Sequence, residues 1–196
     1  MAGHGHGHGG HEEHGPIEGR NKIVALVIAV MALFLAFSET LGKSAQTGAI
    51  SYNVEAANLW AFFQAKNVRR TTVLTAAEAM KVEAATFDAA GKELAAKQID
   101  NWQKVAARYR SEPDVREGTI ELAERAKEAE KKRDTAMAKY HHYEVASAAF
   151  QIGIVLASAT IITGMVLLTY LACGLGVLGL GFMAIGLLAP HAVHLF

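Results

Sequence analysis

Residues 145–196 read VASAAFQIGIVLASATIITGMVLLTYLACGLGVLGLGFMAIGLLAPHAVHLF, and this stretch contains no Lys, Arg, Asp or Glu. A membrane-spanning helix needs about 20 apolar residues, so the stretch is long enough for two spans and too long for one. We predict transmembrane helices over residues 145–169 and 171–190, with a very short turn marked by Tyr170, Cys173 and Gly174. Pro190 ends the second helix because proline cannot continue its hydrogen-bond ladder, and residues 191–196 form a short tail.

A further apolar run, IVALVIAVMALFLAF, occupies residues 23–37 and predicts a transmembrane helix over residues 22–42. Arg20 and Lys22 precede the run, as basic residues do in a secretory signal peptide. We favour a retained span, because a long polar segment comes first and Glu39 stands where the small residues of a cleavage site are expected.

Residues 43–144 hold all but two of the basic residues and all but four of the acidic ones. This Ala-rich segment contains one proline, Pro113, and three glycines, so long helices are its natural state. We therefore expect a charged helical domain outside the membrane, between the first and second spans.

Two apolar seams with alternating spacings of four and three residues run through this domain. Their members are Val73, Ala77, Met80, Ala84 and Phe87 in the first seam, and Ala95, Ile99, Trp102, Ala106 and Tyr109 in the second. The seams are one residue out of phase, which indicates a discontinuity near residues 88–91. A break at residues 111–114, where Pro113 stops one helix and Ser111 or Asp114 caps the next, predicts the turn of an antiparallel, coiled-coil-like hairpin.

The two arms of such a hairpin do not match, because residues 43–110 are more than twice as long as residues 114–144. Part of the outgoing arm must then fold elsewhere, and residues 50–66 are the best candidate. Trp60, Phe62 and Phe63 in this segment could lie along the lipid headgroups, or form the core of a helical bundle. The sequence thus predicts an all-α membrane protein with three transmembrane helices and a helical hairpin between the first and second.

Composition excludes several classes of function. Nineteen basic residues balance nineteen acidic ones, so no excess of positive charge argues for nucleic acid. The single cysteine, Cys173, allows neither an internal disulfide nor a thiolate zinc site. No catalytic triad, phosphate loop or carboxylate pair is indicated, so we expect no enzymatic activity and no cofactor.

Histidines provide an alternative hypothesis, in which the protein handles transition metals or protons. Residues 1–21 form a His- and Gly-rich tail that we expect to be disordered, and imidazoles on it suit zinc, copper or nickel. A second set falls near one membrane face, where carboxylates and imidazoles could bind a metal or relay protons. The tail candidates are His4, His6, His8, His11 and His14, and the second set is Glu39, His141, Glu144, His191 and His194.

The leading hypothesis is self-association, or a scaffold or accessory role in a larger membrane complex. A two-helix hairpin cannot bury both sides of its large aromatic residues, and small residues in the spans allow helices to approach closely. The predicted interface residues are Trp60, Phe63, Gln64, Lys66, Phe87, Ile99, Trp102, Tyr109, Gly153 and Gly176. A third possibility is an oligomeric channel, although residues 23–37 offer no polar group to line a wet pore.

The segment Asn58-Leu-Trp-Ala-Phe-Phe-Gln-Ala-Lys66 resembles a family of bacterial membrane proteins known as domain of unknown function 4337. The likeness extends along the whole chain, although Asn58 replaces an acidic residue of the family pattern and Phe63 replaces a tyrosine. The resemblance implies a multi-pass protein of the bacterial inner membrane and a native His-rich start, and it implies no reaction. The basic residues close to the predicted spans favour a cytoplasmic helical domain and C-terminus.

Overall fold

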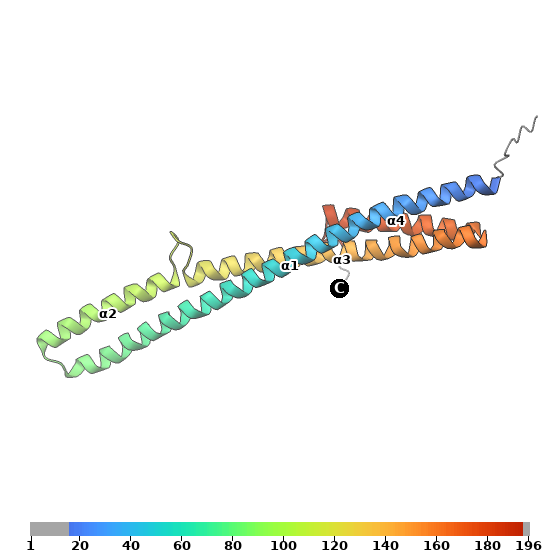
Figure 1. Ribbon diagram of the computed structural model, residues 1–196. Helices are drawn as coiled ribbons and strands as arrows, with labels where there is room; N and C mark the ends of the chain where they lie inside the picture. The colour runs from blue at the N-terminus through green and yellow to red at the C-terminus, as the bar shows by residue number, and fades with distance from the viewer. Residues whose placement is uncertain (1–15, 194–196) are drawn as a thin grey trace, which may run out of the picture. The chain divides into compact units, whose positions relative to one another are not determined.

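The computed structural model describes residues 16–193, and the elements in this range are all helical (Figure 1). They are α1 (Pro16–Glu83), η1 (Ala84–Thr86), α2 (Ala89–Arg110), α3 (Thr119–Thr163) and α4 (Val166–Leu188). Three of them, α1, α3 and α4, are long and apolar enough to cross a membrane. The predicted all-α class with three candidate spans is confirmed.

The chain divides into two compact units, and α1 and α3 each contribute residues to both. Of the described residues, 16–43 and 139–193 belong to the first unit, and Ser44–Ala138 belong to the second. The sequence predicts a transmembrane span up to residue 42 and a helical domain after it, and α1 runs through this boundary without a break as far as Glu83. The segment that follows Gly42 has no proline and is rich in helix-forming residues, so nothing stops the helix there.

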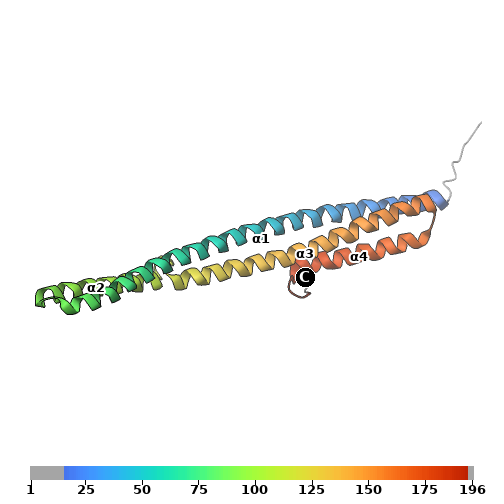
Figure 2. The ribbon, with the colours of Figure 1, turned by 90° about the horizontal axis from the view of Figure 1, so that it is seen from below.

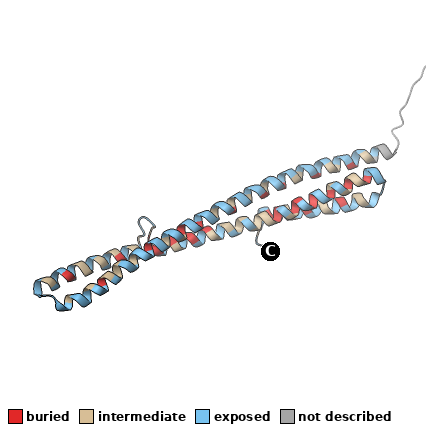
Figure 3. Ribbon diagram, turned by 60° about the horizontal axis from the view of Figure 1, so that its bottom comes forward, coloured by how far each residue is buried: buried red, intermediate tan, exposed pale blue. Residues whose placement is uncertain are grey.

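In the first unit, most of the buried positions lie on α3 (Figure 3). One core cluster joins Val24 of α1 to Ala157 of α3 and Ala172 of α4. In the 18-residue apolar stretch of α3, 33% of the stretch is buried inside the chain, compared with 17% in the corresponding stretches of α1 and α4. Helix α3 is therefore the central helix of this unit.

The turn between the last two helices lies six residues earlier than the sequence predicts. Helix α3 ends at Thr163 and α4 begins at Val166, so Tyr170, Cys173 and Gly174 lie inside α4. Gly164 takes a φ of 70°, a left-handed conformation that glycine adopts readily at a helix end. The Thr163 hydroxyl accepts a hydrogen bond from the Met165 backbone N–H at 3.3 Å, which holds the turn.

In the second unit the chain reverses at Ala84–Asp88 and not near residues 111–114. Helix α2 returns beside the last part of α1 (Figures 1 and 2). The Asp88 side chain caps α2 by accepting a hydrogen bond from the Gly91 backbone N–H at 2.7 Å. The sequence indicates only a discontinuity near residues 88–91. In the structure the chain reverses its direction there.

The break at residues 111–118 interrupts the returning arm without reversing it, since α3 continues beside α1. Ala56 and Leu59 of α1 share a core cluster with Leu122, Ala126 and Ala129 of α3. The outgoing arm therefore ends at Glu83, and its length matches the combined α2 and initial α3. Residues 50–66 belong to this packed arm. The prediction that part of the arm folds elsewhere is therefore wrong.

Candidate functional site

Trp60 and Phe63 pack inside the second unit. Both rings are half-buried against the cluster that joins α1 to α3. They meet edge to face with centroids 5.4 Å apart, and the Trp60 indole Nε1–H donates to the Glu130 carboxylate at 2.9 Å. These two predicted interface residues thus contribute to packing within one chain. Gln64, which follows Phe63 and is also a predicted interface residue, is exposed.

Lys66 is buried, with 7% of its surface exposed, although a lysine seldom is. Its ammonium Nζ lies 3.4 Å from Glu112 Oε2 and 3.6 Å from Glu117 Oε2. The same Nζ stands 5.3 Å from the centre of the Phe62 ring, within range of a cation–π interaction. A buried charge is tolerated when it is paired in this way, so Lys66 fixes α1 to the loop between α2 and α3.

The loop at residues 111–118 is held by several polar contacts to its own flanks. Glu121 accepts a hydrogen bond from the Ser111 hydroxyl at 2.6 Å and one from the Glu112 backbone N–H at 3.3 Å. Thr119 Oγ1 donates to the Arg110 carbonyl at 3.2 Å. These bonds satisfy the Arg110 carbonyl at the end of α2 and the Glu112 backbone N–H just after it, which would otherwise be unpaired.

Two residues of the loop have unusual backbone environments. Arg116 has a φ of 55°, the left-handed region that non-glycine residues rarely adopt, and its carbonyl accepts a hydrogen bond from Arg125 Nη1 at 3.3 Å. Gly118 is buried, and a Cβ there would lie 2.5 Å from Ser111 Cα and 2.6 Å from Glu112 N. The loop therefore needs a glycine at position 118.

Electrostatic contacts lower the pKa values of two carboxyl groups in this cluster. The pKa of Glu112 is lowered mainly by the hydrogen bond from Arg108, and the hydrogen bond from Lys66 lowers it further. The Ser111 hydroxyl is the main cause that lowers the pKa of Glu121. Both groups are therefore ionised at neutral pH and hold the charged network around Lys66.

The other predicted interface residues of the second unit lie on α2 and at the chain reversal. Ile99, Trp102 and Tyr109 are half-buried and share the side of α2 that carries the buried Ala95 and Ala106. Phe87, at the reversal, is 37% exposed. Part of each large side chain thus remains uncovered by its own chain.

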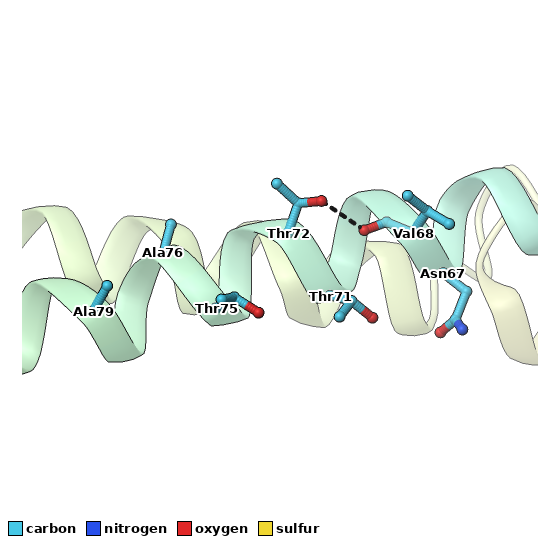
Figure 4. A pocket seen from close by; sticks show the side chains of 7 residues that line it. All are labelled: Asn67, Val68, Thr71, Thr72, Thr75, Ala76 and Ala79. Atoms are coloured by element: carbon cyan, nitrogen blue, oxygen red, sulfur yellow. Dashed lines mark hydrogen bonds between the residues drawn. The ribbon is translucent and has the colours of Figure 1, made fainter.

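An uncharged groove of about 590 Å³ lies on one side of α1 and was missed by the sequence analysis (Figure 4). Its lining is Asn67, Val68, Thr71, Thr72, Thr75, Ala76 and Ala79. Val68 is 65% exposed, whereas Ala77, on the opposite side of the helix, is 1% exposed. A run of small uncharged residues at helical spacing is the sequence signal that could have found it.

Gly153 of α3 and Gly176 of α4, the predicted interface glycines of the spans, both face Met31 of α1 in the same chain. A Cβ at Gly153 would collide with the Met31 side chain, and one at Gly176 would lie 3.5 Å from Met31 Cε. These glycines therefore serve helix packing inside the first unit.

Glu39, His141, Glu144 and His191 of the interfacial set lie within the described residues. His141 Nδ1 and Glu144 Oε2 lie 3.8 Å apart on α3, and Glu39 instead accepts a hydrogen bond from the Gln151 amide at 3.2 Å. His191 is exposed after the end of α4. Within residues 16–193, no three His, Cys, Asp or Glu residues form a group that could hold a metal ion. His4, His6, His8, His11, His14 and His194 lie outside the described residues.

His142 is a buried histidine that the predicted site residues omit. Its Nε2 lies 3.0 Å from the Pro190 carbonyl oxygen, and its ring stacks on Phe182 with centroids 6.1 Å apart. A carbonyl only accepts, so Nε2 carries the proton and donates it to this bond. The contact ties the residues after α4 to α3.

The fold and these contacts define an all-helical protein with three candidate membrane spans and a charged helical unit. The family described as Domain of unknown function (DUF4337) matches residues 20–189, so the chain belongs to this family. The suspected membership is confirmed over almost the whole sequence. Neither the curated proteins nor the solved structures contain a match to the chain.

Proposed function

We propose that this protein is a non-enzymatic membrane protein whose helical unit, residues 44–138, self-associates and serves as a scaffold or accessory subunit of a larger complex. In this proposal the paired arms of the unit form an extramembrane hairpin. The three apolar helices anchor it in the bacterial inner membrane, with the hairpin and the C-terminus in the cytoplasm.

The groove between Asn67 and Ala79 is the observation that carries the proposal. Apolar surface exposed to water costs about 25 cal/mol per Å², and covering it with another helix recovers that free energy. The groove residues are small, so the backbone of a second helix can approach closely. A second copy of the chain is the partner that is present wherever the protein is present, so we assign the groove to self-association.

The half-covered rings of α2 support the same proposal. Trp102 and Tyr109 keep part of their surface exposed after α2 has packed in its own chain. Aromatic residues of this kind are enriched where one protein surface binds another.

The test is the mass of the native particle in mild detergent, measured by light scattering after gel filtration. Thr75→Glu places a charge in the groove, and we expect it to reduce the particle to a smaller species. The matched control is Ala107→Glu, which adds the same charge at an exposed position of α2 outside the groove. A wild-type monomer, or the same oligomer in both variants, would contradict the proposal.

A further inference from the structure

A second groove, of about 340 Å³, lies in the first unit. Leu26, Val30 and Phe34 of α1 line one side, Cys173 and Gly176 of α4 line the other, and Phe150 of α3 also contributes. All these residues lie in helices that are long and apolar enough to cross a membrane. The groove therefore faces hydrocarbon when the protein is inserted.

The chemistry of the groove suits an apolar occupant. Its lining side chains carry no hydroxyl, amide or charged group, so an occupant needs no hydrogen bonds. Leu26 is 64% exposed and Val177 is 70% exposed, so the groove is open along its side. Saturated or unsaturated hydrocarbon can enter it from the surrounding bilayer without desolvating a polar group.

The groove follows the axis of α1. From Leu26 to Phe34 it extends for about 12 Å along the helix, at the helical rise of 1.5 Å per residue. A slender hydrocarbon chain that lies along α1 can occupy a groove of this length and of about 340 Å³.

Glycine on α4 keeps the groove open. A Cβ at Gly176 would be in ordinary contact with Met31, at 3.5 Å from Cε, so further side-chain atoms would extend into the groove. A Cβ at Gly181, on the same helix, would meet nothing within 4 Å. The two positions therefore differ in whether a larger side chain fills this space.

We infer that the groove between α1 and α4 binds one acyl chain of a phospholipid. The groove begins at Leu26, one helical turn from Lys22, which is the basic residue next to the apolar run. The headgroup of the bound lipid then lies at the level of Lys22, in the leaflet on that side of the membrane. This inference is independent of the self-association of the second unit.

The experiment uses the full chain in a nonionic detergent, stripped of lipid and then titrated with dioleoylphosphatidylglycerol. Native mass spectrometry counts the lipids bound per chain. We expect one tightly held lipid in the wild type, about tenfold weaker binding in Gly176→Leu, and unchanged binding in the matched control Gly181→Leu. Val30→Phe fills the groove from α1, and the same loss is expected there if Gly176→Leu does not fold.

Two results would overturn the inference. Equal lipid binding in wild type, Gly176→Leu and Val30→Phe would show that the groove holds no chain. Disulfide formation between Cys173 residues of two copies, lost together with the oligomer in Gly176→Leu, would show that a second copy occupies the groove instead.

Discussion

The ammonium of Lys66 on α1 lies 3.4 Å from the carboxylate of Glu112, although the two residues are 46 positions apart in the sequence. This contact fixes the outgoing arm of the second unit to the loop that interrupts the returning arm. Arg108 binds the other oxygen of the same carboxylate at 2.9 Å, so Glu112 joins three parts of the unit. The motif that resembles the family thus contributes to the internal packing of its own chain.

Replacing Lys66 tests this contact. Lys66→Glu places a third carboxylate beside Glu112 and Glu117, and we expect it to destabilise the protein by about 3 kcal/mol, the range measured for broken buried ion pairs. Lys66→Met keeps the apolar stem and leaves Glu112 bound to Arg108, so its cost is smaller. Urea unfolding of the full chain in detergent measures both.

The control Lys97→Glu breaks the exposed pair with Glu93, and its cost stays below about 1 kcal/mol. Equal costs at positions 66 and 97 would contradict the role of Lys66.

Acid is expected to weaken the second unit. The pKa values of Glu112 and Glu121 are lower in the folded chain than in the unfolded chain, where a glutamate has a pKa of about 4.3. Their stabilising contribution is therefore complete above that value, and is lost as the pH falls through the lower folded pKa. Urea midpoints between pH 7 and pH 3 follow the loss. Glu112→Gln removes one of the two carboxyl groups and should reduce this pH dependence.

Two glycines should respond to alanine with opposite signs. Gly118→Ala forces a Cβ against the backbone of Ser111 and Glu112, and we expect a loss of about 1–3 kcal/mol. Gly48→Ala meets nothing within 4 Å inside α1, so it should stabilise the helix by up to about 1 kcal/mol. Thermal unfolding followed by circular dichroism compares the two variants. A stable Gly118→Ala protein would show that the loop adopts another conformation.

The indole of Trp60 should contribute through its hydrogen bond as well as through its ring. Trp60→Phe removes the donor to Glu130 and keeps an aromatic ring, for an expected cost of about 1–2 kcal/mol. A double-mutant cycle with Glu130→Ala, which removes the acceptor, isolates the interaction between the two side chains. Additive effects of the two substitutions would mean that the bond contributes nothing to stability.

Local features of the sequence were sufficient to predict the candidate spans and the helical class. The uncharged stretch from residue 145 and the apolar run at residues 23–37 identify helices long and apolar enough to cross a membrane, because this property depends on length and hydrophobicity. The positions of the turns were harder to predict. The sequence predicts the turn near Gly174, whereas the structure places it at Gly164, since a glycine ends a helix or stays inside it according to what packs against it.

The candidate site was predicted as a set of residues but not as an arrangement. The sequence selected Trp60, Phe63 and Lys66 by their types, and placed them at an interface between chains. Only the tertiary structure paired Lys66 with Glu112 and Trp60 with Glu130. It did so because the chain reverses at residues 84–88, which sets the register of α1 against α2 and α3.

The sequence by itself determined which segments are helical and apolar, since these properties depend on neighbouring residues. The tertiary structure decided which side chains meet, since that depends on packing between segments far apart in the chain.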